Sequence, residues 1–130
     1  MRHGHYPVAI MQLPARVDAQ GELLLLHDLD LRMDANRPRV VLDCSRLLQF
    51  DKPVVHLLLC CLEEAMKRNG DVKLAELPDD VCAIFTWFGL DGLFEVYATV
   101  SGAVDSFLQS PQDRRSQNNL LTGSQNTTIN

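Results

Sequence analysis

Short apolar runs alternate with longer amphipathic segments along this chain, and this alternation constrains its fold more than any other feature. Four apolar runs are typical of short strands: residues 8–13, 40–42, 72–77 and 94–97. Four amphipathic segments are typical of helices: residues 19–35, 52–68, 78–89 and 100–107. Strands that alternate with helices favour parallel pairing through right-handed crossovers. The sequence therefore predicts an α/β fold.

The first helix has a clear start and a less certain interior. Asp18 is placed to cap its N-terminus, and Glu22 follows in the first turn, where the helix dipole favours an acid. Leu25, Leu29 and Met33 share one face at helical spacing. Residues 23–26 are also compatible with a strand, so both interpretations stay open for that stretch.

The second and third helices have stronger signals. In the second, Asp51 is the expected N-cap, Pro53 lies in the first turn, and Asn69-Gly70 follows as a left-handed cap. Its expected core face is Val54, Val55, Leu58, Cys61, Leu62, Ala65 and Met66. The third helix closes at Gly89 and leaves Trp87 partly exposed. Its expected core face is Val81, Ile84, Phe85 and Phe88.

Composition indicates one acidic domain with polar ends. The chain has 130 residues, a net charge of −5 and 46% hydrophobic residues. The acidic balance argues against nonspecific nucleic-acid binding. The longest apolar run, 54–62, is too short to span a membrane, and an apolar signal-peptide core is missing, so we expect a cytoplasmic protein. Residues 108–130 are rich in Asn and Gln, which predicts a disordered tail. We expect residues 1–7 to form a flexible N-terminus and residues 8–107 to form the folded unit.

The cysteine and histidine pattern predicts neither a metal nor a cofactor. Cys44, Cys60, Cys61 and Cys82 form no CxxC pair, so we expect reduced thiols that pack as small hydrophobic groups. The amine of Met1 and the imidazole of His3 could chelate copper, but an incidental terminus is the simpler interpretation. The acidic residues Asp28, Asp30 and Asp34 are expected on a solvated face.

Four short blocks resemble a known family when taken in order. They are Arg16-Val17-Asp18, residues 40–45 (Val-Val-Leu-Asp-Cys-Ser), Phe50-Asp51, and residues 89–97 (Gly-Leu-Asp-Gly-Leu-Phe-Glu-Val-Tyr). Together they resemble the STAS domain of bacterial anti-sigma factor antagonists and of the cytosolic tails of sulfate transporters. The resemblance implies a mixed, mostly parallel sheet of about four strands with four helices. It also implies a non-enzymatic module that binds an anti-sigma factor, a serine kinase or other STAS proteins.

The family's regulatory switch is missing at its usual place. Regulatory STAS proteins carry a phosphorylated Ser or Thr after the Asp that starts the second helix. Here Asp51 is followed by Lys52 and Pro53, neither of which accepts phosphate. Ser45 is a weak substitute candidate, because a Ser after a strand more often serves a turn. The sequence therefore predicts partner binding without this switch.

The expected partner-binding surface is the start and the outward face of the second helix. Its residues are Asp51, Lys52, Pro53, His56, Leu59, Cys60 and Glu63. Alternatively, Leu59 packs beneath a neighbouring helix or in a homodimer. His56 and Cys60 are one turn apart, but the sequence reveals neither an orienting acid nor an oxyanion donor, so no catalytic residue is predicted. The alternative function is a cytosolic STAS subunit of a membrane transporter for lipids or anions.

Overall fold

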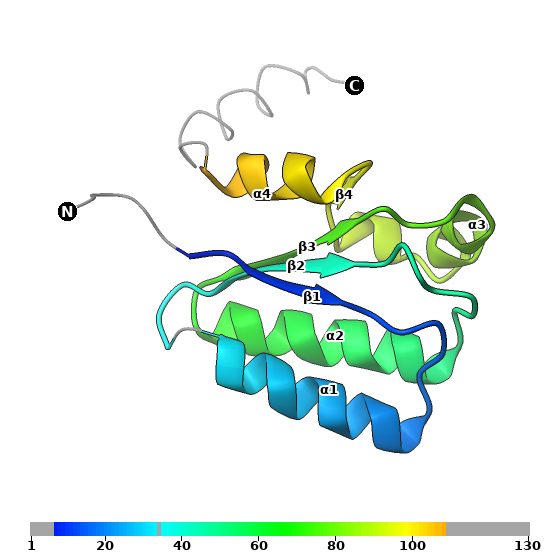
Figure 1. The fold of residues 1–130 in the computed structure, drawn as a ribbon, viewed down its shortest axis with the longest axis horizontal. Coiled ribbons are helices and arrows are strands. Elements are labelled where there is room, and N and C mark those ends of the chain that lie inside the picture. Colours follow the sequence, from blue (N-terminus) through cyan, green and yellow to red (C-terminus); the bar gives the residue numbers. More distant parts are fainter. Residues whose placement is uncertain (1–6, 34, 109–130) are drawn as a thin grey trace.

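A computed structural model describes residues 7–33 and 35–108 of the chain and confirms the α/β class (Figure 1). The strands are β1 (Ala9–Gln12), β2 (Arg39–Asp43), β3 (Asp71–Ala75) and β4 (Val96–Tyr97). The helices are α1 (Ala19–Arg32), α2 (Lys52–Lys67), α3 (Asp79–Trp87), the short 3₁₀ helix η1 (Leu90–Gly92) and α4 (Val100–Leu108). The predicted tail, apart from Leu108 at the end of α4, lies outside the described residues, as do residues 1–6 and Asp34.

The strands of the sheet pair in their order along the chain, β1-β2-β3-β4. All three pairs are parallel, with Ala9 opposite Val40, Arg39 opposite Asp71, and Leu74 opposite Val96. The prediction of about four mostly parallel strands is therefore confirmed, whereas the sheet is not mixed, since every described pair is parallel. All four carboxyl ends of the strands point to the same edge of the sheet, where α2 and α3 begin.

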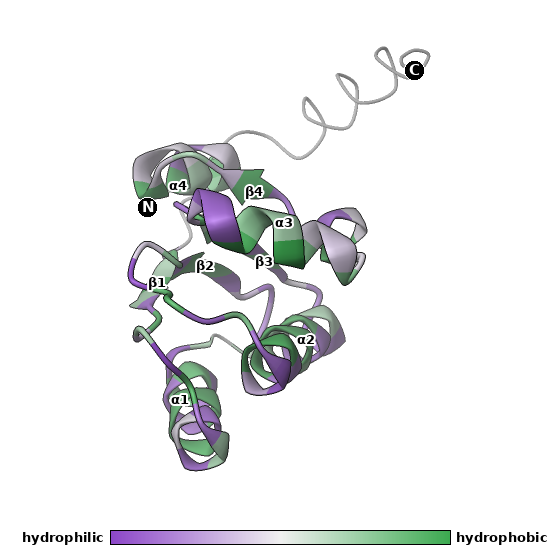
Figure 2. Cartoon of the chain, turned by 90° about the vertical axis from the view of Figure 1, so that its right-hand side faces the viewer, coloured by the Kyte–Doolittle hydropathy of each residue, from purple (hydrophilic) through white to green (hydrophobic). Residues whose placement is uncertain are grey.

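Helices cover both faces of the sheet (Figures 1 and 2). On one face, Val40, Leu42, Val72 and Leu74 pack with the apolar sides of α1 and α2. On the other face, Val41 and Ala75 pack with Ala103 and Phe107 of α4. Both faces of β2 are apolar, which explains the continuous run at residues 40–42. Within the described residues, the helices are too short or too polar to cross a bilayer.

Residue 18 caps α1 as expected. The backbone N–H of Gly21 donates to Asp18 Oδ1 at 2.7 Å, and Leu29 and Met33 are buried. Residues 23–26 are helical, so the strand interpretation of that stretch is wrong. The helix ends at Arg32, three residues before the predicted end, where Met33 becomes extended.

The buried side of α2 differs from the predicted one. Val54, Leu58, Cys61, Leu62 and Ala65 are buried as expected, whereas Met66 is 62% exposed. Leu57, which the prediction left out, is fully buried. The helix packs against the sheet and also against α1, so its buried arc is turned toward α1 and away from Met66. Asp51 occupies the N-cap position, but its side chain makes no capping hydrogen bond.

The core face of α3 is narrower than predicted. Val81 and Phe85 are buried, but Ile84 and Phe88 are each 40% exposed, which corrects their assignment to the core. The reason is the position of α3 beyond the carboxyl ends of the strands, where only one edge of the helix touches the core (Figure 1). Gly89 adopts a left-handed conformation, with φ at 78°, and closes the helix as predicted.

Candidate functional site

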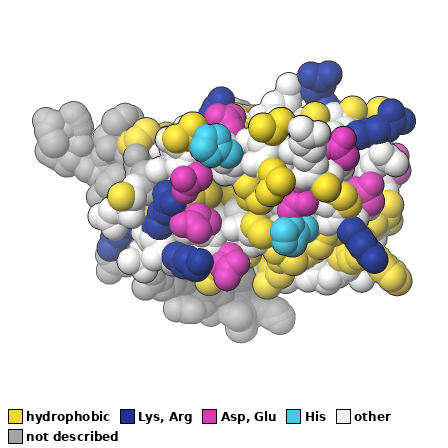
Figure 3. Space-filling model, turned by 90° about the horizontal axis from the view of Figure 1, so that it is seen from below, with side chains coloured by type: hydrophobic (Ala, Val, Ile, Leu, Met, Phe, Trp, Pro, Cys, Tyr) yellow, Lys and Arg dark blue, Asp and Glu magenta, His cyan; other side chains and the backbone are white. Residues whose placement is uncertain are grey.

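The seven predicted partner-binding residues lie at the start of α2 and along its solvent-facing ridge. Asp51, Lys52, His56, Leu59 and Glu63 are exposed, whereas Pro53 and Cys60 are half-buried. Figure 3 shows the face formed by α1 and α2, where hydrophobic side chains are interspersed with charged residues and histidine. The structure does not gather the seven residues into one patch. His56 and Cys60 lie on the flank of α2 that faces α1, Leu59 and Glu63 lie on the opposite flank, and the other three lie at the start of the helix.

The flank that faces α1 carries a polar cluster. Nδ1 of His56 contacts Oε2 of Glu22, and Nε2 of His56 lies 3.4 Å from Sγ of Cys60. Glu22 comes from the first turn of α1 and is only 8% exposed. Sequence reasoning assigned Glu22 to the helix dipole and missed this contact, since residues 22 and 56 belong to different helices.

The opposite flank of α2 forms a shallow apolar groove. Leu59, Leu62 and Met66 line it together with Glu63 and Lys67, around a volume of about 450 Å³. Leu59 is 38% exposed, so no described residue of this chain covers it fully. Among the described helices, none therefore packs over Leu59, and the alternative of packing beneath a neighbouring helix is wrong for this part of the chain.

The start of α2 carries a positive charge instead of a hydroxyl group. Its first turn holds Lys52 and Pro53 and contains no acid. Ser45, the substitute candidate for phosphorylation, is exposed in a turn, where its backbone N–H donates to Asp43 Oδ1 at 3.0 Å. This hydrogen bond agrees with the turn role that the sequence suggested for Ser45.

An exposed aromatic pair lies beside the start of α2. The ring of Phe50 is 5.9 Å from Phe85 and 6.2 Å from Phe88, centroid to centroid. The Phe88 ring in turn meets Trp87 edge-on at 5.3 Å, and Trp87 is 81% exposed. The exposure of Trp87 was predicted. The exposure of Phe88 was not, because its helical spacing with Phe85 indicated a core position.

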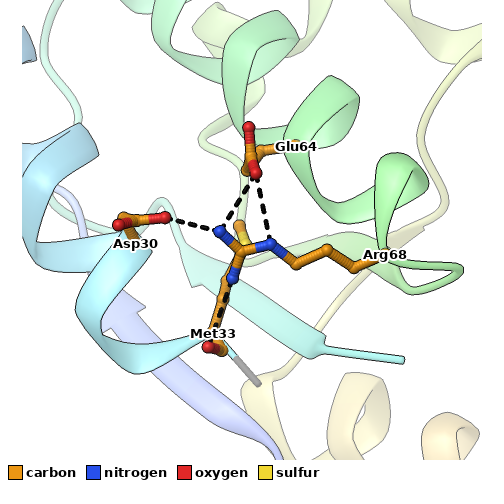
Figure 4. A network of polar contacts seen from close by, with 4 residues as sticks. All are labelled: Asp30, Met33, Glu64 and Arg68. Atoms are coloured by element: carbon orange, nitrogen blue, oxygen red, sulfur yellow. Dashed lines mark hydrogen bonds and ion pairs between the residues drawn. The ribbon is translucent and has the colours of Figure 1, made fainter. Parts of the chain in front are cut away.

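Arg68, just after the end of α2, makes a network of polar contacts with α1 and α2 (Figure 4). Its guanidinium donates to Asp30 at 2.6 Å, to Glu64 at 3.0 Å and to the backbone carbonyl of Met33 at 3.3 Å. The hydrogen bond to Asp30 is the main cause that raises the pKa of Arg68, and Glu64 acts in the same direction. The contacts join the C-terminal ends of the two helices.

The cysteines separate into two classes. Burial raises the pKa of the Cys44 and Cys61 thiols to about 12, so both stay protonated at neutral pH. Cys60 and Cys82 are half-buried. Cys60 also lines a hollow of about 350 Å³ between α1 and α2, opposite His27 and Asp30. Cys61 lines the same hollow but is only 1% exposed, so of the adjacent pair Cys60 is the thiol that lies beside His56.

The cluster of Cys60, His56 and Glu22 resembles a nucleophile, a base and an orienting acid, which the sequence did not reveal as a set. A thiol enzyme also needs donors for a developing oxyanion. Cys60 lies in the middle of α2, where the backbone N–H groups are used in helical hydrogen bonds. The described surroundings of Cys60 therefore hold no backbone oxyanion site, and the arrangement suits ligation better than acyl transfer.

Comparison with known proteins agrees with this fold. Residues 8–96 match the family model described as "Mlab, STAS domain". One similar structure is an anti-sigma factor antagonist (STAS) domain protein from Planctomyces limnophilus, with 15% identity, a TM-score of 0.68, and coverage of 77% of this chain and 90% of the other. Another is a candidate anti-sigma factor antagonist from Thermotoga maritima, with 14% identity, a TM-score of 0.67, and coverage of 77% and 88%.

Among curated proteins, none matches the sequence. The two similar structures share the α/β arrangement of the sheet and helices. Their sequence identities to this chain are so low that the likeness supports the fold alone. The family model covers most of the chain, from just before β1 into β4. On this ground the protein belongs to the STAS domain family.

Proposed function

We propose that the chain is a non-enzymatic, cytoplasmic interaction module that binds an anti-sigma factor serine kinase and lacks the usual phosphorylation switch. The observation that carries the proposal is the exposed Trp87–Phe88 pair beside Phe50, two residues before Lys52. In STAS proteins of the antagonist type, the start of the second helix and the loop before it contact partners. Here that region combines a fixed positive charge with an exposed aromatic surface.

The aromatic pair supplies the apolar part of the proposed contact. Trp and other aromatic side chains dominate the binding energy of many interfaces because they bury much area at a low entropic cost. Trp87 is 81% exposed and is held edge-on by Phe88, so its position is partly fixed before binding. A partner that covers this pair removes a large apolar side chain from water.

The start of α2 determines whether phosphorylation can regulate the proposed contact. A phosphate group there would add about −1.5 to −2 charge beside the contact surface and switch binding. Lys52 and Pro53 offer no hydroxyl group for that modification. We therefore expect the chain to bind its partner constitutively.

Affinity capture of the tagged full chain from its native lysate tests the proposal. We expect a serine kinase of the anti-sigma type to be enriched by the wild type and lost with Trp87→Ala. Leu31→Ala is the matched control, because Leu31 is 70% exposed on α1, away from this surface. With the purified kinase, Trp87→Ala should weaken binding at least tenfold, and equal affinity of both variants would reject the surface.

A second variant tests the missing switch. Lys52→Ser restores a hydroxyl group directly after Asp51. We expect the captured kinase and ATP to phosphorylate this variant and release it, while leaving residues 52–54 of the wild type unmodified. Phosphorylation of the wild type at Ser45, read by mass spectrometry, would show that the switch has moved instead of vanished.

The alternative function makes a different prediction for the same capture. A STAS subunit of a membrane transporter would recover an ATP-binding subunit and a permease in place of a kinase. The apolar groove of Leu59, Leu62 and Met66 is the surface to test in that case, with Leu59→Asp as the variant. Loss of the transporter subunits in Leu59→Asp, together with their retention in Trp87→Ala, would favour the alternative.

A further inference from the structure

We propose that Glu22, His56 and Cys60 form a binding site for a divalent metal ion of the zinc type, which joins α1 to α2. The site is independent of the partner proposed above, and neither proposal depends on the other. It uses the carboxylate of Glu22 on α1 together with the imidazole of His56 and the thiol of Cys60 on α2.

The geometry is the first argument. The candidate ligand atoms of the three side chains all lie within 4.8 Å of one another. Zinc binds oxygen, nitrogen and sulfur at about 2.0–2.3 Å, so one ion placed among these atoms can reach all three after small side-chain rotations. His56 and Cys60 are one turn apart on α2 and therefore project side by side, with Cys60 Sγ 3.9 Å from His56 Nδ1, the ring nitrogen that contacts Glu22.

The burial of Glu22 is the second argument. Glu22 is only 8% exposed, although a carboxylate is costly to remove from water without a cation or hydrogen-bond donor beside it. The group that faces it is His56, whose side chain is 65% exposed and contacts the carboxylate through Nδ1. A divalent ion between the two would compensate the carboxylate, and the exposed side of His56 leaves a fourth position open to water.

The donor set selects the metal. A thiolate with an imidazole and a carboxylate suits zinc and similar transition metals, whereas magnesium and calcium prefer oxygen ligands alone. On binding, Cys60 gives its thiol proton to solvent as the sulfur–metal bond forms. The neighbouring Cys61 is 1% exposed and points into the core, so it does not compete.

Titration of the reduced, metal-free full chain with Co²⁺ tests the site. We expect one equivalent to produce a sulfur-to-cobalt charge-transfer band in the near ultraviolet, and Zn²⁺ to remove it by displacement. Cys60→Ser should abolish the band, and Glu22→Gln should weaken Co²⁺ binding at least tenfold. Cys82→Ser is the matched control, because Cys82 is also half-buried but lies on α3, and it should keep the full band.

Thermal unfolding supplies a second measurement. Because an ion that binds only the folded state raises its stability, Zn²⁺ should raise the melting temperature of the wild type and of Cys82→Ser but not of Cys60→Ser. Folding of each variant is checked by its melting curve without metal. A His3→Ala variant controls for binding at the N-terminus, which offers no thiolate and hence no charge-transfer band.

Three results would overturn the proposal. They are a stoichiometric Co²⁺ complex without the thiolate band, a band that survives in Cys60→Ser, or a Zn²⁺-induced stabilisation that persists in that variant.

Discussion

Gly70 lies where the backbone passes close to Pro38 of a neighbouring segment. A Cβ atom at this position would lie 2.1 Å from the carbonyl oxygen of Pro38 and 2.6 Å from its Cδ. The sequence predicted that the pair Asn69-Gly70 ends α2 with a left-handed cap, and the left-handed residue is Asn69, with φ at 63°. Glycine is therefore required at position 70 for space and not for its backbone angles.

Gly70→Ala should therefore be clearly destabilising. The neighbour is backbone, which moves at a cost, and overpacking of this kind lowers the free energy of unfolding by about 1–3 kcal/mol or more. Gly92→Ala is the control, because a Cβ there meets no atom of the described residues within 4 Å. Urea unfolding measures both variants, and equal midpoints would contradict the close approach at Pro38.

Lys73 is a fully buried cation in the middle of β3. Its ammonium group donates to Ser106 Oγ at 2.7 Å, pairs with Glu95 Oε1 at 3.2 Å, and lies 4.3 Å from the centre of the Phe107 ring. Ser106 in turn donates to the carbonyl oxygen of Ala103 at 2.6 Å. The charge therefore attaches β3 to α4.

Ser106→Ala should destabilise the protein more than Lys73→Met. The first change removes an acceptor from a buried charge, which costs about 1–3 kcal/mol. The second replaces the cation with an apolar side chain of similar length, which is often neutral or stabilising. Urea midpoints give the order, and a larger loss for Lys73→Met would mean that the charge stabilises the fold.

At the scale of elements, Arg68 fixes the ends of α1 and α2 against each other. Its planar fork reaches Asp30, Glu64 and the Met33 carbonyl at the same time (Figure 4). A lysine keeps the positive charge but cannot reproduce this arrangement of donors. The pairing thus depends on geometry as well as on charge.

Arg68→Lys should lower the free energy of unfolding by about 1 kcal/mol, since Asp30 and Glu64 are partly exposed and surface pairs are weak. Arg32→Lys is the control, because Arg32 and its partner Asp28 are both about half exposed on the same helix, and the other contact of Arg32, with the Ile10 carbonyl of β1, does not involve α2. Denaturant unfolding at low and high salt measures both. An equal effect of the two changes would contradict a special role for the fork.

The sequence predicted where the helices begin and end better than it predicted which of their faces are buried. Asp18, Pro53 and Gly89 mark local backbone events, and the structure has helix ends at or next to each of them. Met66, Ile84 and Phe88 were assigned to the core by periodicity alone, yet periodicity does not say how wide a face the neighbours cover. The Glu22–His56 contact depends on how α1 and α2 pack, which no local pattern contains.

At the scale of the whole molecule, α4 completes the second face of the sheet. The family model ends at residue 96, before this helix begins. Ala103 and Phe107 nevertheless cover Val41 and Ala75, which are almost fully buried. The helix is therefore part of the folded unit and not an appendage to it.

A chain that ends at residue 108 should match the full chain in stability, whereas one that ends at residue 99 should lose several kcal/mol. The reason is that removal of α4 takes away the buried ring of Phe107 and exposes Val41 and Ala75 to water, and full burial of a side chain such as Val or Phe is worth about 1.5–3 kcal/mol. Thermal and urea unfolding compare the three chains. Equal stability of the chain ending at residue 99 would contradict this role of α4.

The sequential order of the sheet also determines how the molecule can assemble as it is synthesised. Each strand pairs with the one made just before it, so a growing chain can add β2 to β1, β3 to β2 and β4 to β3 without waiting for a distant segment. The side of the sheet that carries Lys73 is the exception, because its cover, α4, is made after all four strands. Until residue 108 has left the ribosome, that side is open to water and to chaperones.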